Sequence, residues 1–171
     1  MFYKLSDLCS VITKGTTPST VGFDFTEEGI NFIKSEQLIT QRKLNYSNRY
    51  YICSEAHKAL KRSQLHENDI LMSIAGAYLG KLAMVSKSDL PANTNQAVGI
   101  IRCKDRLVNP LFLFYHLSTD KMRKVISSFN AQSAQPNINL AQIGELQINV
   151  PNMHEQNHIV NTISSLLLKS F

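Results

Sequence analysis

The clearest pattern along the chain is a period-2 alternation across residues 69–75, in which isoleucine or methionine falls on every second position. Alternation of this kind predicts a β-strand. A second strand is expected at 81–85, and the five residues between the two, 76–80, begin and end with glycine. The stretch therefore predicts a β-hairpin with a glycine-bounded tip.

The same periodicities predict the other elements. Strands are expected at 29–34 and 98–102 and just before Pro151, and residues 3–12 form a loosely alternating segment. Helices are expected at 55–63 with Ser54 as the cap, at 110–117, at 120–129 and from Pro151 onward. The predicted fold class is α+β, with a curved, mostly antiparallel sheet, flanking helices and a C-terminal coiled-coil-like helix.

Composition narrows the function classes. The 171 residues carry a net charge of +5, a basic balance that permits nucleic-acid binding. Three cysteines without Cys-x-x-Cys spacing argue against a disulfide framework or a zinc site. No apolar run approaches the length of a membrane span, and polar residues interrupt the N-terminal segment. We therefore expect a cytoplasmic protein with no membrane, metal or cofactor and no catalytic residue.

The hairpin tip carries candidate contacts to a polyanion. Tyr78 lies between the two glycines, Lys81 follows the tip, and Lys61 and Arg62 end the preceding helix. Lysine and arginine bind phosphates, glycine permits a close backbone approach, and an aromatic ring can stack or wedge. The alternative is an ordinary hairpin with a solvated tip.

Two further segments combine hydroxyl, amide and charged groups. Lys14, Thr16 and Thr17 lie in a loop after a short element, where their groups suit phosphates or base edges; the alternative is a turn closed by its own hydroxyls. Residues 34–37, Lys-Ser-Glu-Gln, follow a strand. Glutamine and glutamate can contact base edges, although Ser35 could instead cap a helical turn.

Other polar segments are assigned mainly by elimination. Residues 130–139 are rich in amides and uncharged, too polar for a core and too short for a disordered tract. Asn95 and Gln96 enter an apolar strand, where a structural role is favoured over a DNA contact. The basic and tyrosine-rich segment 41–52 is expected to be a β-rich connection rather than a nucleic-acid contact.

The segment Asn109-Pro110-Leu111-Phe112 resembles part of the catalytic motif of amino-methyltransferases. The second proline of that motif is missing, and no glycine-rich cofactor loop precedes it. A helix cap by Asn109, with Pro110 at the first helical position, is the favoured account.

The last helix has a coiled-coil seam, with Ile159, Ile163 and Leu166 at spacings of four and three and Leu167 widening the apolar face. An apolar helix of this kind is expected to pair with a second helix. The alternative is that it packs on its own domain.

Six segments in this order resemble the target-recognition domain of the specificity subunit of type I restriction-modification systems. They are VITKGTTP at 11–18, GINFIKSEQL at 29–38, LKRSQLHENDILMSIAGAYLGK at 60–81, NTNQAVGIIR at 93–102, AQSAQPNI at 131–138 and VPNMHEQNHI at 150–159. The resemblance implies a recognition domain at 1–150 and the start of a conserved spacer helix at 151–171. It also implies recognition of one half of a split DNA target, without catalysis.

The implied partners are double-stranded DNA, a methyltransferase (modification) subunit, a restriction subunit, and either a second specificity domain or a second copy through the last helix. The residues expected to contact DNA are those of the polar and basic segments: Lys14, Thr16, Thr17, Lys34, Ser35, Glu36, Gln37, Lys61, Arg62, Tyr78, Lys81, Gln132, Ser133, Gln135 and Asn137. Two other functions stay open at this point, a protein-interaction module and a degenerate DNA amino-methyltransferase.

Overall fold

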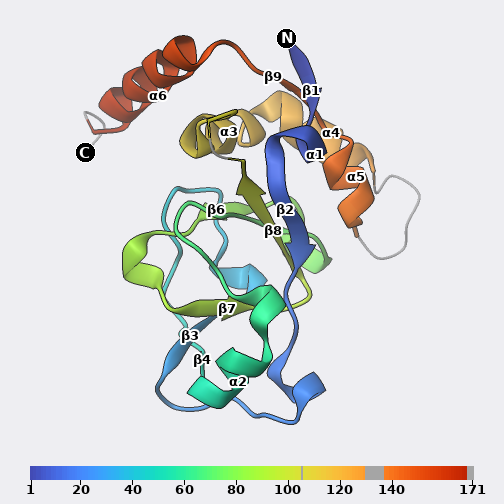
Figure 1. Ribbon diagram of the computed structural model, residues 1–171, viewed down its shortest axis with the longest axis vertical. Helices are drawn as coiled ribbons and strands as arrows, with labels where there is room; N and C mark the ends of the chain where they lie inside the picture. Colours follow the sequence, from blue (N-terminus) through green and yellow to red (C-terminus); the bar gives the residue numbers. More distant parts are fainter. Residues whose placement is uncertain (105, 130–136, 169–171) are drawn as a thin grey trace.

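A four-stranded antiparallel sheet forms the centre of the computed structural model, which describes residues 1–104, 106–129 and 137–168 (Figure 1). Its strand order is β2-β8-β5-β6. The strands are β2 (Cys9–Lys14), β8 (Val98–Cys103), β5 (Ile70–Ser73) and β6 (Leu82–Met84). The predicted hairpin is confirmed, because β5 and β6 pair from Ile70 opposite Met84 to Met72 opposite Leu82.

Two smaller sheets accompany the central one. The first has the order β4-β3-β7 and contains the one parallel pair among the named strands, β3 with β7. Its strands are β3 (Ile30–Ile33), β4 (Tyr51–Ile52) and β7 (Ala92–Thr94). The second consists of β1 (Phe2–Lys4) and β9 (Gln147–Asn149). The α+β class is confirmed, but the strands of the described residues form three sheets instead of one, since periodicity identifies strands without their pairing.

The helices are α1 (Leu5–Leu8), α2 (Ser54–Ala59), α3 (Pro110–Leu117), α4 (Asp120–Ser128), α5 (Leu140–Gly144) and α6 (Met153–Leu168). Short 3₁₀ helices are η1 (Pro18–Val21), η2 (Ser35–Gln37), η3 (Lys61–Ser63), η4 (Gly76–Tyr78) and η5 (Lys87–Asp89). No helix within these described ranges is long and apolar enough to cross a membrane.

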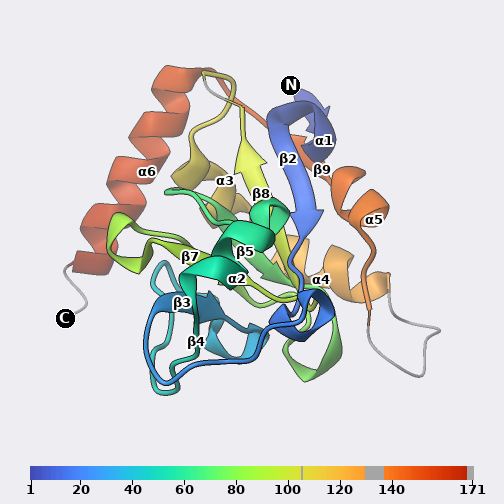
Figure 2. The ribbon, with the colours of Figure 1, turned by 60° about the horizontal axis from the view of Figure 1, so that its bottom comes forward.

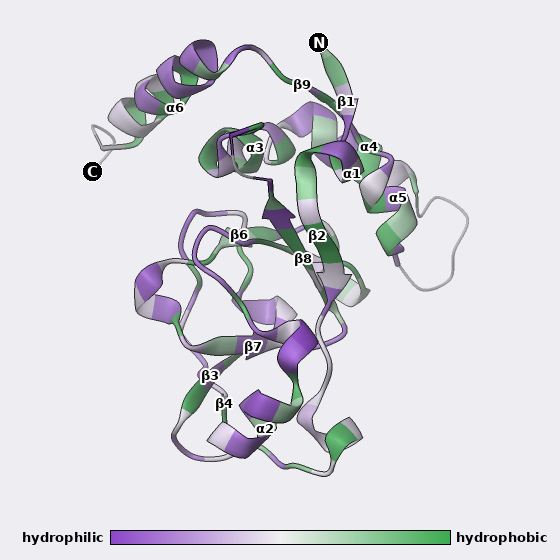
Figure 3. Cartoon of the chain, viewed as in Figure 1, coloured by the Kyte–Doolittle hydropathy of each residue, from purple (hydrophilic) through white to green (hydrophobic). Residues whose placement is uncertain are grey.

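Each face of the central sheet covers a different core. Ile70 and Met72 of β5 pack with α3, α4 and α5 in one cluster. Leu71, between them, belongs to a second cluster that includes Ile33 of β3. Successive strand residues point to opposite faces, so the alternating strand is buried on both sides. Figure 3 shows hydrophobic residues along β2, β8 and α3 and hydrophilic residues on much of α2.

Two element predictions require correction. The helix predicted at 55–63 ends at Ala59 and is followed by η3, and its cap is Cys53, whose sulfur accepts a hydrogen bond from the Ala56 amide. The segment 3–12 is divided into β1, α1 and β2 because Leu5 and Leu8 both turn into the core.

The C-terminal helix α6 lies beside α3 at the opposite end of the molecule from α2 (Figure 1). Across residues 153–167 of this helix Gln156 and Val160 are buried, and the Gln156 side chain accepts a hydrogen bond of 2.8 Å from the Asn109 amide. Ile159, Leu166 and Leu167 are exposed, while Ile163 is half-buried. The helix thus packs on its own domain with one face and presents part of the predicted seam on another.

Candidate nucleic-acid interface

The ends of four strands meet at one end of the central sheet. Strands β2 and β5 both run antiparallel to β8, so that Lys14 lies opposite Gly99 and Ser73 opposite Val98. The parallel strands β3 and β7 end together at Ile33 and Thr94, and the Thr94 carbonyl accepts a hydrogen bond of 3.0 Å from the Thr16 amide. The segments that follow these strands therefore start side by side.

We call these segments, together with the adjoining residues of η3 and Asn137, the polar edge and define it as residues 14–17, 34–37, 61–62, 75–81, 95–97 and 137. Figure 2 shows the loop that follows β5 beside the blue loop that follows β2. The polar edge contains most of the residues expected from the sequence to contact DNA.

A close backbone contact fixes the first segment. Gly15 packs so tightly against β7 that a Cβ atom would lie 2.0 Å from the Thr94 carbonyl oxygen. Its amide also donates a hydrogen bond of 3.2 Å to the Val98 carbonyl. Only glycine fits at this position, because a side chain would overlap the Thr94 carbonyl. The contact of Gly15 with β7 holds the neighbouring Lys14 in an exposed position at the edge.

The basic end of η3 lies beside this loop. The Arg62 guanidinium donates to the Thr16 hydroxyl at 3.4 Å, and both Lys61 and Arg62 are exposed. Beneath them the fully buried Asn93 amide donates to the Leu60 carbonyl at 3.1 Å and to the Ser63 hydroxyl at 3.2 Å. A buried polar side chain thus connects η3 to β7.

The Asn95-Gln96 pair divides between two roles. The Asn95 side chain accepts from the Ala97 amide, which is the expected structural role. Gln96 is exposed, and its carbonyl oxygen accepts a hydrogen bond from the Thr17 hydroxyl. The sequence favoured a structural role for both residues; the Thr17–Gln96 bond fits that role, while the exposure of Gln96 leaves its side chain at the surface of the edge.

An aromatic group surrounds Lys34. Its ammonium nitrogen lies 3.6 Å from the Tyr50 ring centroid and 4.5 Å from that of Phe25. The Tyr50 hydroxyl donates a hydrogen bond of 2.9 Å to Glu36. The sequence analysis did not identify these two rings as neighbours of Lys34. Phe25 lies nine residues earlier in the chain, and Tyr50 belongs to the segment 41–52, which was assigned to a connection.

The prediction that Gln37 contacts bases is wrong, because its side chain is buried and internally bonded. Its side chain is 2% exposed. The carbonyl oxygen accepts from the Lys34 amide at 2.9 Å, and the amide nitrogen donates to the Asn48 carbonyl at 3.1 Å. Its polar groups therefore close the 3₁₀ turn and attach the next loop, which matches the alternative of a helical turn at this position. Ser35 and Glu36 stay half-buried at the surface.

The hairpin tip completes the edge. Tyr78 is 44% exposed, and Gly76 and Gly80 both have a φ of +77°, which favours glycine. Lys81 is exposed at the first residue after the tip. Asn137 pairs with Ala75 at the same end of the sheet. The predicted contacts Gln132, Ser133 and Gln135 lie outside the described residues.

The segment that resembles a methyltransferase motif is a helix start. The Asn109 side-chain oxygen accepts hydrogen bonds from the Leu111 and Phe112 amides, at 2.9 and 3.3 Å, and α3 begins at Pro110. The predicted cap is confirmed, and it lies near the end of β8, away from the polar edge.

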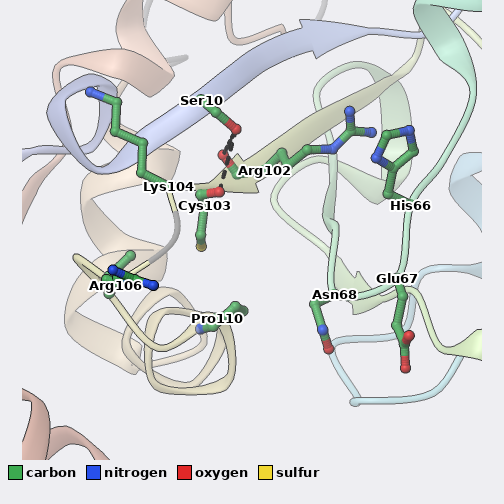
Figure 4. Close-up of a pocket in the computed structure, with 10 residues that line it drawn as sticks. Ser10, His66, Glu67, Asn68, Arg102, Cys103, Lys104, Arg106 and Pro110 are labelled. Atoms are coloured by element: carbon green, nitrogen blue, oxygen red, sulfur yellow. Dashed lines mark hydrogen bonds between the residues drawn. The ribbon is translucent and has the colours of Figure 1, made fainter.

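A cavity of about 510 Å³ lies at that opposite end of the central sheet (Figure 4). Two of its cations have internal partners: Arg102 binds the fully buried Asp69 at 2.7 Å, and the Lys104 ammonium donates to the Asp7 carbonyl. Burial raises the pKa of the Cys103 thiol in its wall to about 12. Across the described part of the chain, no group of histidine, cysteine and acidic residues could hold a metal ion.

Comparison with known proteins identifies the family. The family model described as "Type I restriction modification DNA specificity domain" matches residues 1–170. The type I restriction enzyme EcoBI specificity subunit of Escherichia coli is 27% identical over 143 residues, which are 84% of this chain and 30% of that subunit. The chain thus spans less than a third of the length of this relative.

Solved structures share the fold. The HsdS subunit from Thermoanaerobacter tengcongensis superposes with a TM-score of 0.75 at 16% identity, over 99% of this chain and 42% of that chain. The type I restriction-modification S subunit from M. genitalium gives a TM-score of 0.65 at 19% identity, over 96% of this chain and 38% of that chain. The resemblance inferred from the six sequence segments is confirmed: the chain belongs to the type I restriction-modification DNA specificity domain family.

Proposed function

We propose that this domain recognises one half of a split DNA target as the non-catalytic specificity component of a cytoplasmic restriction-modification complex. The observation that carries the proposal is the convergence of the polar edge, in which loops from four strands meet with exposed lysine and arginine. A duplex is a rigid ligand, so residues that contact it together must lie on one side of the protein. Membership of the specificity-domain family supports the same function.

Within the polar edge, charged and uncharged side chains have different proposed roles. Lys14, Lys61, Arg62 and Lys81 are exposed and bind phosphates, with Lys34 as a fifth contact from within its aromatic surroundings. Phosphate contacts set the position and the affinity, whereas hydroxyl, amide and carboxylate groups select the bases. Gln96 joins Thr16, Thr17, Ser35, Glu36, Tyr78 and Asn137 in the second group.

Salt dependence tests the phosphate contacts. About five neutralised phosphates give a slope of about −4 to −5 in a plot of log binding constant against log salt concentration. Lys81→Ala is expected to reduce the slope by about one and to weaken binding to all sequences alike. A slope near zero for the unchanged chain would contradict the proposed contacts.

Sequence selection tests the function itself. The 171-residue chain is incubated at low salt with a pool of duplexes that carry a randomised segment, and the retained duplexes are sequenced. We expect a short preferred sequence, and we expect Gln96→Ala to alter the preference at one or two positions without removing binding. Retention without any preferred sequence would refute the proposal.

The remaining partners follow from the family and from α6. We propose that a methyltransferase subunit and a restriction subunit assemble with the whole specificity protein. The exposed seam residues Ile159 and Leu167, with Leu166, pair with a helix of a second specificity domain or of a second copy. Analytical ultracentrifugation separates these possibilities: a concentration-dependent dimer that Ile159→Lys abolishes supports the second copy.

A further inference from the structure

The Glu36 carboxylate is held by one hydroxyl group at the polar edge. Tyr50 Oη donates a hydrogen bond of 2.9 Å to Glu36 Oε1. This bond raises the pKa of Tyr50, so the hydroxyl stays protonated and remains a donor at neutral pH. Among the described residues the hydrogen bond to this carboxylate goes to Oε1, and Oε2 is the second acceptor of the same group.

The ring that carries this hydroxyl is itself well supported. The Tyr50 carbonyl accepts a hydrogen bond of 2.8 Å from the Phe32 amide in β3. Its ring lies against the Lys34 ammonium and, at a centroid distance of 6.2 Å, against Phe25. Phe25 in turn packs edge-on against the fully buried Phe32, at 5.1 Å. The position of the hydroxyl is therefore set from the core outward.

The hairpin tip reaches the same place from another strand. The Thr40 amide, in the segment that follows Glu36, donates a hydrogen bond of 2.8 Å to the Leu82 carbonyl at the start of β6, and the Tyr78 hydroxyl adds a small further rise to the pKa of Tyr50. Because Tyr78 is exposed on the tip and is a proposed DNA contact, the Glu36–Tyr50 pair lies where a bound duplex would pass.

We propose that Tyr50 is a positioning residue that fixes the Glu36 carboxylate to select a base with an exocyclic amino group, adenine or cytosine, at one position of the target. The inference rests on the proposed function and adds a base class to it. An ionised carboxylate only accepts hydrogen bonds. In the major groove adenine and cytosine present an amino donor, whereas guanine and thymine present oxygen acceptors that would face the carboxylate without a hydrogen.

Tyr50→Phe tests the role of the hydroxyl, since it keeps the ring against Lys34 and Phe25. In the selection on randomised duplexes, the preference for adenine or cytosine at one position is expected to fall about tenfold, the scale of a lost base contact. Affinity for duplexes of unrelated sequence is expected to change less than about twofold. Tyr46→Phe is the matched control, because it removes a tyrosine hydroxyl bond of 2.6 Å to Asp89 that lies outside the polar edge.

Glu36→Gln shows whether Tyr50 acts through Glu36. It is expected to change the preference at the same position as Tyr50→Phe, and the double variant should change it no further than Glu36→Gln alone. Unchanged preferences in Tyr50→Phe, effects of the two variants at different positions, or an equal effect of Tyr46→Phe would overturn the inference. An unchanged chain that selects no sequence would instead refute the proposed function, and this inference with it.

Discussion

A single close contact at Gly15 joins the loop after β2 to the end of β7. The nearest backbone oxygen leaves no room for a Cβ atom, which would lie 2.0 Å from it. The Thr16 amide bonds to the same carbonyl group of Thr94. The spacing between two segments of the polar edge therefore depends on the absence of one side chain.

Gly15→Ala is expected to destabilise the fold by about 1–3 kcal/mol, as for other overpacked sites. It is also expected to weaken duplex binding, because the loop that carries Lys14 and Thr16 must move away. Urea unfolding and a binding titration measure the two effects. Gly144→Ala is the control, since its Cβ would meet nothing closer than 3.4 Å; equal losses in both variants would contradict the account.

His116 on α3 gives the stability a pH dependence. Burial, and then the nearby charge of Lys121, lower the pKa of His116 below its ordinary value of 6.5. The unfolded chain therefore binds more protons than the folded chain as the pH falls through 6.5, and stability is lost in that range. Urea unfolding at about pH 7.5 and about pH 5.5, on either side of that value, measures this loss of unfolding free energy. The loss should be smaller for His116→Gln than for the unchanged chain, and an equal loss in both would contradict His116 as its cause.

Adjacent residues can have opposite roles, and the sequence does not separate them. Glu36 and Gln37 both have side chains that can contact base edges, yet Gln37 is buried and Glu36 bonds Tyr50 at the surface. Successive residues of a 3₁₀ helix are turned by about 120°. The sequence therefore predicts the segment that carries such contacts, but not which of its side chains faces the ligand.

At the scale of elements, the sequence predicts strongly periodic strands and helices well, and it predicts short elements poorly. The hairpin β5–β6 and the helix α3 were predicted because alternation or a cap with proline marks them. The division into three sheets was not predicted, and of the 3₁₀ helices only the turn at Ser35 was considered, as an alternative. Pairing between distant strands depends on contacts such as Ile33 with Thr94, which no local pattern records.

Asn109→Ala tests the cap of α3. The loss of the hydrogen bonds to the Leu111 and Phe112 amides is expected to cost about 1 kcal/mol of unfolding free energy. Asn157→Ala is the control, because it removes only the exposed bond of 2.9 Å between the two asparagines and keeps the cap. Equal effects of the two variants, measured by urea unfolding, would assign the stabilisation to the contact between helices.

A thermal-shift measurement with S-adenosylmethionine tests whether the same segment belongs to a methyltransferase site. If Asn109 is a cap and not part of a methyltransferase site, the unfolding temperature should not change with added cofactor. A clear increase that Asn109→Ala removes would favour the degenerate methyltransferase.

At the scale of the whole molecule, topology produces the polar edge. Strands β2 and β5 share a direction because each pairs antiparallel with β8, and β3 runs parallel to β7, so four chain segments end together. The sequence supplied the polar and basic segments and, through six matching blocks, the family. Their arrangement on one side depends on the long-range pairing of all these strands, which local sequence patterns do not determine.

The most direct measurement follows backbone amide NMR signals of the 171-residue chain during titration with a duplex that carries the selected sequence. We expect the largest shifts in residues 14–17, 34–37, 61–62, 75–81 and 95–97, and small shifts around Asn109 and the cavity at the other end of the central sheet. Shifts concentrated at that other end, or spread evenly over both ends, would contradict DNA recognition by the polar edge.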